Sequence, residues 1–411
     1  MRIGRAGVAS HRVFDSVEEL LDPTFLSEVA GADVVSVQST LLTADFAHSG
    51  SELSLVECTL QSVQSPIGAG RKIRFILKRL APERDWLMRI TEDDKCRSVA
   101  LWAEGILDRL PSTIDHCIVG AARDAVSRDA VGGEPAGGEA WAILMRDVGE
   151  YFVTNQRFTA AQGRLFTDSM AAMHAEFFED TAPSAPEVGL SELKHVFDMF
   201  APRTALRKDA GAGDILKRIT DGWRTAREVC PPDVMEIIDP LLEDPSPLVD
   251  ALMAYPTTLI HGDFRHSNLA VLPPAAGDGT EEPAGSRVAL LDWQLATLAP
   301  PAVELGRYIG ANSPFLPESK EALLENYRVA FAEQLSARGA RRRAGSSVTR
   351  FSDEWWIPQL ELGFLGGFVQ DGWAIALKAT TWHVGEAYRS HWLADLDWWA
   401  ERVRRGARRL G

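Results

Sequence analysis

The sequence is poor in cysteine, and its four cysteines lie far apart. None belongs to a Cys-x-x-Cys pair, so the spacing of a thiolate metal site is missing. A chain of 411 residues can build a sizeable core and does not depend on a disulfide framework. We therefore expect Cys58, Cys96, Cys117 and Cys230 to be free thiols in a reducing cytoplasm.

Long apolar runs are also missing. The most apolar stretch, residues 360–379, is interrupted by Glu361, Asp371 and Lys378. It therefore predicts a buried helix and not a membrane span. The first twenty residues lack an apolar signal core, which favours a cytoplasmic protein without a membrane partner.

Positive charge is in deficit. Lysine and arginine number 43 against 58 aspartate and glutamate residues, a net charge of −15. This balance argues against a general affinity for nucleic acid, whose phosphates would be repelled. It is compatible with a cationic small substrate, although acidic surfaces commonly serve only solubility. With 45% hydrophobic and 25% charged residues the chain is globular, and its length suits two or three packed units.

The order of predicted elements indicates an α+β chain in which a small strand-rich lobe precedes a large helical lobe. Partial alternation of Val, Thr and Leu with polar residues predicts strands at 34–42, 53–60, 73–80 and 141–148. Helical spacing predicts helices at 16–30, 95–110, 158–180, 192–199, 212–229, 233–242 and 320–338. The final stretch, residues 354–410, is also expected to be helical. Two short strands, 269–272 and 288–291, interrupt the helical half. We therefore expect an N-terminal lobe of residues 1–146 and a C-terminal lobe of residues 147–411.

The strongest chemical signal is LIHGDFRHSNLAVL, residues 259–272, followed by VALLDWQLA at residues 288–296. Asp263 and Asn268 share one short loop, and Asp292 follows the second strand. Carboxylate and amide oxygens are the ligands that magnesium prefers, so we assign Asn268 and Asp292 to a metal site. Asp263 is then free to accept the proton of an attacking hydroxyl group.

This pattern, His-x-Asp with an asparagine five residues after the aspartate and then a hydrophobic run and Asp-Trp, resembles the aminoglycoside phosphotransferase and choline-kinase-like group of small-molecule kinases. Two other segments are similar to that group: MAAMHAEFF at 170–178 and DWQLATLAPPAVELGRYIG at 292–310. The resemblance covers most of the chain. It implies a protein-kinase-like two-lobe fold and ATP-dependent, magnesium-dependent phosphate transfer to a hydroxyl of a small molecule.

The resemblance also implies how the catalytic loop is supported. Glu304 stands where the family commonly has an aspartate that braces this loop, so the charge is kept but the side chain is one methylene longer. We interpret His261 as a structural histidine bonded to the loop backbone, and not as a catalytic base.

The nucleotide is expected to bind against the N-terminal lobe. Lys78 lies on a predicted strand, as the phosphate-binding lysine of these kinases does, and its ammonium group can bridge phosphate oxygens. A small-residue turn before that strand allows close backbone approach to phosphates. The residues assigned here are Ser49, Gly50 and Ser51 for the phosphate-covering turn and Met145, Arg146 and Asp147 for the hinge whose backbone reads the adenine.

One position departs from the family pattern. Such kinases pair the strand lysine with a glutamate on the following helix, but here that helix opens with Arg97-Ser98. Glu104 comes six residues later, on another side of a helix. Glu92 or Asp94 could replace the glutamate only if the helix began earlier. A catalytically weak or inactive nucleotide-binding protein of the same fold is therefore the alternative function.

A second alternative is a metallohydrolase in which His261, Asp263, His266 and Asp292 bind zinc or manganese. It needs further ligands, and the other histidines have no metal-like spacing.

The acceptor is left open among aminoglycosides, choline-like amines, sugars and other metabolites, as is the oligomeric state. The tryptophan-rich C-terminal segment could supply an aromatic cage for a quaternary ammonium group, but helix packing explains it equally well. These tryptophans are Trp355, Trp356, Trp373, Trp382, Trp392, Trp398 and Trp399.

Overall fold

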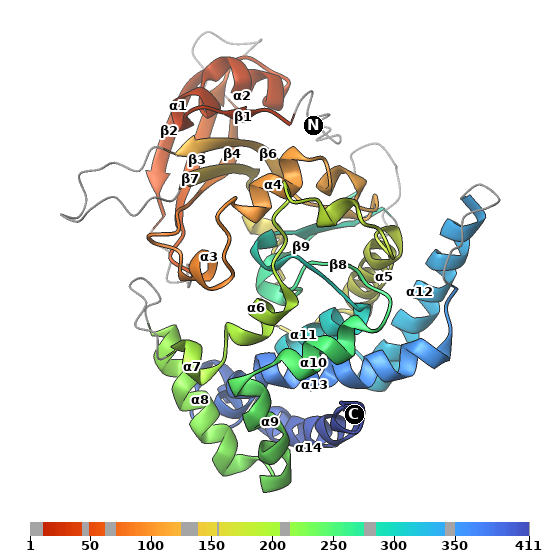
Figure 1. Ribbon diagram of the computed structural model, residues 1–411. Coiled ribbons are helices and arrows are strands. Elements are labelled where there is room, and N and C mark those ends of the chain that lie inside the picture. The colour runs from red at the N-terminus through yellow and green to blue at the C-terminus, as the bar shows by residue number, and fades with distance from the viewer. Residues whose placement is uncertain are drawn as a thin grey trace.

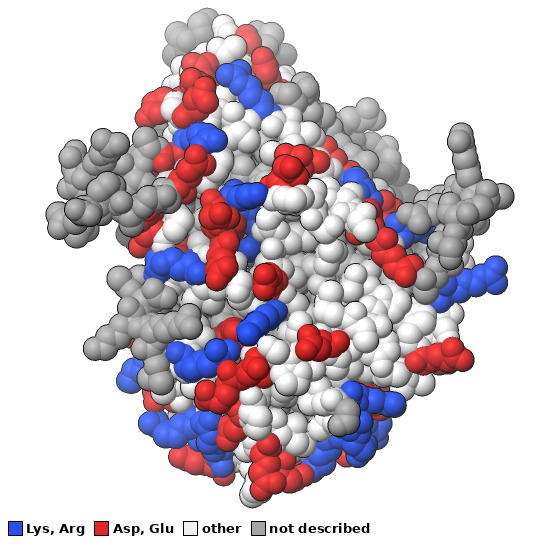
Figure 2. Space-filling view, in the orientation of Figure 1, with Lys and Arg blue, Asp and Glu red and all other residues white. Residues whose placement is uncertain are grey.

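The computed structural model describes residues 11–42, 49–61, 71–124, 139–153, 156–205, 214–274, 285–341 and 350–410. A mixed sheet with short helices comes first along the chain, and a larger helical body follows it (Figure 1). The expected α+β fold class is therefore confirmed. On the face drawn in Figure 2, acidic and basic side chains are interspersed, so the net negative charge forms no single acidic surface there.

The N-terminal part is built on a six-stranded sheet of order β1-β6-β7-β4-β3-β2. Its strands are β1 Val13–Phe14, β2 Val34–Leu41, β3 Glu52–Leu60, β4 Lys72–Leu80, β6 Ile118–Asp124 and β7 Ala140–Arg146. All neighbours are antiparallel except β1 and β6. Lys78 lies on a central strand, where it is paired with Leu53 of β3 and Ile143 of β7. This placement holds its backbone on both sides.

Two short helices pack on one face of this sheet, where a single helix over residues 16–30 was expected. They are α1 Val17–Leu20 and α2 Pro23–Ala30. The break has a local cause, because Asp22 is extended and accepts the Thr24 amide, while proline at the first position starts a new helix.

The expected helix over 95–110 is also shorter than predicted. Helix α4 Arg97–Ala103 is followed by left-handed Gly105 and a 3-10 turn over Leu107–Arg109. Before it lies α3 Trp86–Ile90, whose N-terminal amides bond the side chain of Asp85. That cap places a buried carboxylate directly beside the sheet, close to Lys78.

The rest of the chain is mostly helical and carries two small sheets. The helices are α5 Ala160–Glu176, α6 Leu193–Asp198, α7 Pro202–Ala205, α8 Ile215–Val229, α9 Pro232–Glu243, α10 Ser246–Met253, α11 Pro301–Asn312, α12 Lys320–Arg341, α13 Asp353–Ala379 and α14 Arg389–Ala407. The strands are β5 Ile114–Asp115, β8 Thr258–Ile260, β9 Leu269–Leu272, β10 Arg287–Leu290 and β11 Thr297–Ala299. They pair in the orders β5-β10-β9 and β11-β8.

Helix α13 is the central helix of this body and is buried over most of its length. The helical stretch expected over 354–410 consists of two helices, since α13 ends at Ala379 and α14 begins at Arg389. A Cβ on Gly306 of α11 would lie 2.5 Å from the Gly363 carbonyl oxygen of α13, so the two backbones touch. Within the described ranges, no helix is long and apolar enough to cross a membrane.

Candidate active site

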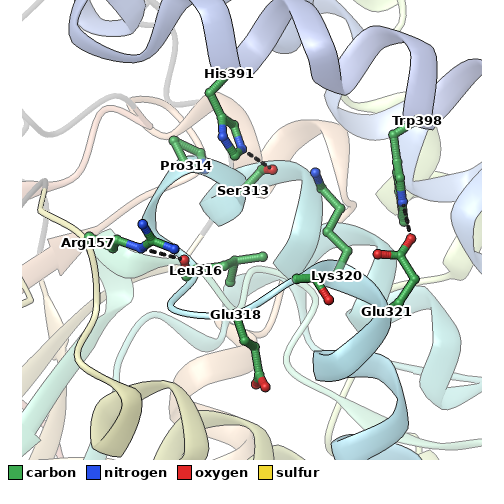
Figure 3. Close-up of a pocket in the computed structure, with 10 residues that line it drawn as sticks. Arg157, Ser313, Pro314, Leu316, Glu318, Lys320, Glu321, His391 and Trp398 are labelled. Atoms are coloured by element: carbon green, nitrogen blue, oxygen red, sulfur yellow. Dashed lines mark hydrogen bonds between the residues drawn. The ribbon is translucent and has the colours of Figure 1, made fainter.

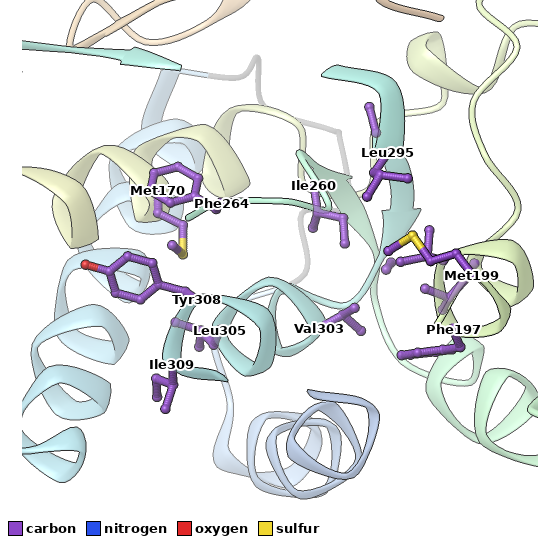
Figure 4. Packing of buried hydrophobic residues seen from close by; sticks show 14 of the residues in the cluster. Met170, Phe197, Met199, Ile260, Phe264, Leu295, Val303, Leu305, Tyr308 and Ile309 are labelled. Atoms are coloured by element: carbon purple, nitrogen blue, oxygen red, sulfur yellow. The ribbon is translucent and has the colours of Figure 1, made fainter. Parts of the chain in front are cut away.

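The loop between β8 and β9 carries the predicted catalytic residues, and the core anchors it. Phe264 is fully buried beside Tyr308 of α11, with ring centroids 5.8 Å apart (Figure 4). Gly262 has a positive φ of 80°, and a Cβ there would lie 2.3 Å from the Leu295 carbonyl oxygen. Only glycine fits this close approach. The neighbouring Asp263 is therefore held between two fixed backbone positions.

Glu304 of α11 bonds the backbone of this loop at two positions. Its fully buried carboxylate accepts the backbone N–H of His261 at 2.6 Å and that of Gly262 at 3.0 Å. The longer side chain thus satisfies two loop donors at once. His261 Nδ1 accepts the Asp263 amide at 3.2 Å, and its Nε2 lies 2.9 Å from the Leu291 carbonyl oxygen. Both ring nitrogens are therefore engaged with backbone.

Asp263 lies among three side chains. Its Oδ2 accepts the side-chain amide of Asn268 at 2.9 Å, and Arg265 Nε lies 3.0 Å from the same oxygen. Its Oδ1 accepts two N–H groups of Arg307, from Nε at 3.0 Å and Nη2 at 2.6 Å. Burial alone would raise the pKa of Asp263, but Arg265 and Arg307 outweigh burial and hold it well below the usual value. Asp263 is thus kept ionised.

Arg307 continues this chain of charges into α13. Its Nη1 donates to Asp371, and the side chain of Arg307 is only 5% exposed. The two carboxylates on either side raise the pKa of Arg307 despite its burial. Arg307 therefore sits between Asp263 and Asp371 as a permanent buried cation.

Asn268 and Asp292 lie at the same end of a hairpin. Strands β9 and β10 pair Leu269 with Leu290, and the Leu291 amide donates to the Asn268 carbonyl at 3.0 Å. Asp292 then adopts a left-handed backbone conformation, φ 68°. The structure therefore brings the two predicted metal residues, Asn268 and Asp292, close together. Asp263 joins them because it is bonded to Asn268.

Lys78 reaches this point from the sheet. Its Nζ donates to Asp292 at 2.9 Å and to Gln294 Oε1 at 3.1 Å. Burial would lower the pKa of Lys78, but Asp292 and then Asp85 outweigh it and raise that pKa. The lysine, the two hairpin-end residues and the catalytic loop thus form one connected set.

Asp85 is the carboxylate that is linked to Lys78, through Gln294, where the kinases that the sequence resembles have a glutamate on a helix. It accepts the Gln294 side-chain amide at 3.1 Å, and Gln294 in turn accepts from Lys78. Burial raises the pKa of Asp85, while Lys78 opposes that rise. The residues considered from the sequence, Glu92, Asp94 and Glu104, are all exposed. Neither Glu92 nor Asp94 therefore replaces the missing glutamate.

The predicted phosphate-covering turn packs against the segment before α3. Gly50 has φ 101°, and a Cβ there would lie 2.0 Å from the Arg84 carbonyl oxygen. Ser49 accepts the Trp86 amide through its carbonyl at 2.9 Å, and its hydroxyl lies 2.8 Å from that of Ser51. The Ser51 hydroxyl donates to Asp85 at 3.4 Å. The turn is thus tied to the same charge network as Lys78.

The predicted hinge lies at the end of β7, and part of its backbone is used within the sheet. Met145 pairs with Ile76 and Ile118. The Arg146 amide donates to the Cys117 carbonyl at 2.9 Å, and the Asp147 amide donates to the Arg74 carbonyl at 3.3 Å. Those two N–H groups are therefore already bonded.

The metallohydrolase alternative has little support. Among the residues that the structure describes, no group of three or more His, Cys, Asp or Glu side chains is arranged to hold a metal. The His266 ring lies 4.8 Å from that of Phe315, and burial followed by Arg265 lowers its pKa to about 4.

Three of the C-terminal tryptophans are already covered by cations of the chain itself. Lys378 lies over Trp392 at 4.4 Å, and Arg218 lies over Trp382 at 5.3 Å. Trp398 borders a pocket of about 230 Å³ with Lys320 and His391 (Figure 3). Its ring is approached by Lys320 at 5.1 Å and by Arg402 at 4.5 Å. These contacts, together with burial of Trp356, Trp373 and Trp399, account for the aromatic segment.

Part of this helical body is similar to a known family of phosphotransferases. Residues 149–344, a little under half of the chain, match the family model described as the phosphotransferase enzyme family. The predicted resemblance is confirmed. The matched range includes Asp263, Asn268 and Asp292 but not Lys78 or α13.

Solved structures and curated sequences were also compared. Ethanolamine kinase from Plasmodium vivax is 13% identical, with 92% of this chain and 84% of that one covered at a TM-score of 0.44. Amicoumacin kinase hAmiN, in complex with AMP-PNP, Ca²⁺ and Ami, is 12% identical, with 93% and 95% covered at 0.41. Choline kinase LicA from Streptococcus pneumoniae is 14% identical, with 91% and 98% covered at 0.37. None of the curated proteins matches the chain.

Four contributing residues were missed by sequence reasoning: Asp85, Gln294, Arg307 and Asp371. Gln294 lies inside the quoted motif VALLDWQLA, and Arg307 follows Glu304 by one helical turn. Those spacings were signals that could have been used. Asp371 was noted only as an interruption of an apolar stretch, and its role depends on how α13 packs on α11.

Proposed function

We propose that this phosphotransferase-like chain is an ATP-dependent kinase that transfers the γ-phosphoryl group to a hydroxyl of a small molecule. The observation that carries the proposal is the convergence of Asp263, Asn268, Asp292 and Lys78 at one place between the sheet and the helical body. We also propose that the lobes divide where β7 ends, at residue 146.

The residues present fit a magnesium–nucleotide complex. The Asn268 amide nitrogen donates to Asp263, which leaves its oxygen for a ligand. The side chain of Asp292 is 35% exposed, so its carboxylate is reachable. Both are hard oxygen donors of the kind that magnesium takes. Magnesium held by Asn268 and Asp292 would neutralise phosphate charge.

The other residues would act directly on the reactants. Lys78, which is paired with Asp292 in this structure, would bind a phosphate oxygen, and the turn of Ser49, Gly50 and Ser51 would cover the phosphates. Met145 and Asp147 would flank the adenine. Asp263 would accept the acceptor hydroxyl proton as the O–P bond forms and the bond to the ADP oxygen breaks.

The lowered pKa of Asp263 makes it a weak base. Because Arg265 and Arg307 hold this pKa well below its usual value, Asp263 orients the hydroxyl and receives the proton late. This suits a loose transition state, in which positioning and charge neutralisation supply most of the acceleration.

Two single substitutions test the proposal. Asp263→Asn should lower turnover by about 10²–10⁴-fold while nucleotide affinity changes little, since only proton acceptance and orientation are lost. Asp292→Asn should abolish magnesium-dependent nucleotide binding. ADP release measures the first and calorimetry the second, with Asp397→Asn as an exposed control. Unchanged turnover in the first variant, or normal magnesium-dependent binding in the second, would refute the assignments.

A nucleotide-binding protein without transfer activity is the second candidate. It is favoured by one observation, that Arg265 and Arg307 already occupy both oxygens of Asp263. Its signature is a thermal shift with ATP and magnesium but no ADP release with any hydroxylated compound.

A further inference from the structure

The tryptophan faces that could hold a cationic acceptor are already in use. Lys378, Arg218 and the pair Lys320 and Arg402 lie over Trp392, Trp382 and Trp398 respectively. A cation lies over an aromatic face because the face carries the negative part of the ring quadrupole. A second cation would have to displace the first, so these rings are poor sites for a quaternary ammonium group.

Lys378 stands out because of where it lies. It follows Asp371 by seven residues on α13, which places the two side chains on the same face of the helix, two turns apart. Asp371 contacts Arg307, and Arg307 contacts Asp263. The charges that act on Lys378 are those of Asp371, Arg307, Arg265 and Asp395. Lys378 therefore belongs to the surroundings of the catalytic loop.

Lys378 also lacks a partner of opposite charge. Within the described part of the chain, the ammonium group of this half-buried residue makes no hydrogen bond or ion pair and lies over the Trp392 ring. Each of the two carboxylates near it bonds another cation through one oxygen, Asp371 with Arg307 and Asp395 with Lys320, while the Oδ2 atom of each makes no hydrogen bond. The ammonium group of Lys378 has three donors, and because its Nζ is not fully buried a ligand oxygen can reach them in place of water.

The cations around Asp263 outnumber the anions. Arg265, Arg307, Lys320 and Lys378 face the three carboxylates of Asp263, Asp371 and Asp395. Burial, and then Arg307 and Arg265, lower the pKa of Lys378 to about 8, against Asp371 and Asp395. An amine placed here would meet like charge, whereas an anion would supply acceptors for the Lys378 ammonium group and relieve the repulsion between these cations.

We propose that the acceptor carries a carboxylate or phosphate group that Lys378 binds while the acceptor hydroxyl lies at Asp263. This inference rests on the proposed kinase function and narrows its substrate class to hydroxylated anions. Lys378 is then a specificity residue that contacts the acceptor and takes no part in the transfer of the proton or the phosphoryl group.

Calorimetry with four probes tests this proposal in the presence of magnesium and AMP-PNP. Malate and glycerol 3-phosphate are hydroxylated anions, one a carboxylate and the other a phosphate, while choline and ethanolamine are hydroxylated cations. We expect at least one anion to bind and neither cation to bind. Lys378→Gln should weaken anion binding at least tenfold, and Lys378→Arg should largely preserve it because the charge is kept. Lys194→Gln, at an exposed lysine near Asp244, is the matched control.

The outcomes separate the two proposals. If the wild type binds magnesium–AMP-PNP but prefers choline or ethanolamine, the anionic acceptor is wrong and the kinase function stands. Binding of neither anion, or equal binding by wild type and Lys378→Gln, also overturns the role of Lys378. If magnesium–AMP-PNP itself does not bind, the kinase function fails. The two anions show which of carboxylate and phosphate Lys378 receives.

Discussion

Two charge networks meet at the candidate active site, and they are built differently. On the nucleotide side, Lys78 of β4 bonds Asp292 of the β10 loop, so the contact joins the sheet to the helical body. On the other side, Arg307 of α11 bonds Asp263 and Asp371 entirely within the helical body. Asp292 is 35% exposed, whereas the side chain of Arg307 is 5% exposed.

This difference separates a contact that can be exchanged from one that is fixed. Solvent reaches Asp292. Under the proposed function a metal ion could therefore take its carboxylate, and Lys78 would then be free to bind a phosphate group. Arg307 cannot leave without exposing two buried carboxylates to one another. The backbone contact between Gly306 and Gly363 holds α11, which carries Arg307, closely against α13. The site therefore has an exchangeable half, the contact of Lys78 with Asp292, and a rigid half, the contacts of Arg307 with Asp263 and Asp371.

The largest effect should come from breaking the rigid half. In Arg307→Met, two buried carboxylates lose the cation that bridges them, which should lower the free energy of unfolding by about 3–5 kcal/mol. Turnover should fall by about 10²-fold, because Asp263 loses the two bonds that orient it. Urea unfolding and ADP release measure the two effects.

Arg307→Lys is the control for this prediction. A lysine keeps the charge but lacks the planar pair of donors, so it should restore most of the stability and less of the turnover. If Arg307→Met has the unfolding free energy and the turnover of the wild type, Arg307 does not hold this half of the site in place.

A smaller loss should follow Glu304→Gln, which also acts on the fixed side. The amide offers one acceptor oxygen where the His261 and Gly262 amides now use two. One buried donor is left without an acceptor, at a cost of about 1–3 kcal/mol. Thermal unfolding measures it, and Glu304→Asp should be milder because both oxygens remain. Stability equal to the wild type in both variants would mean that the loop does not depend on this brace.

Asp85→Asn tests the exchangeable half. If Asp85 keeps Lys78 charged and placed once Asp292 turns to a metal ion, magnesium–nucleotide affinity should fall by about tenfold, or 1.4 kcal/mol. Asp94→Asn is the matched control, since Asp94 was a candidate from the sequence and is exposed. Calorimetry measures the affinity of both variants. A loss confined to the Asp94 variant would mean that Asp94, and not Asp85, supports Lys78.

The two halves also differ in how far the sequence predicts them. Asp263 and Asn268 share one loop, and Asp292 is brought to them by a hairpin, so local spacing was enough. The contact of Arg307 with Asp371 depends on how α11 crosses α13, which no local pattern encodes. Helix ends were missed although their signals are local: the expected helix over 16–30 breaks at Asp22-Pro23, and Gly105 follows α4 in a left-handed conformation.

The smallest effect should appear in the pH dependence of acceptor binding, and it sharpens the division between the halves. The pKa of Lys378 is lowered to about 8 by burial and by Arg307 and Arg265, against Asp371 and Asp395. Only the charged ammonium group attracts an anion, so the KM for an anionic acceptor should be flat below pH 7. It should rise about fourfold between pH 7 and 8.5 as this group loses its proton. His266 is another titratable group near this position, and its pKa of about 4 keeps it neutral throughout this range. In Lys378→Arg the rise should disappear, because arginine stays charged.

The KM for the nucleotide is the internal control, and it should stay level over the same pH interval, since Lys78 is held charged by Asp292 and Asp85. If the KM for the acceptor and the KM for the nucleotide rise together, the titrating group is not Lys378.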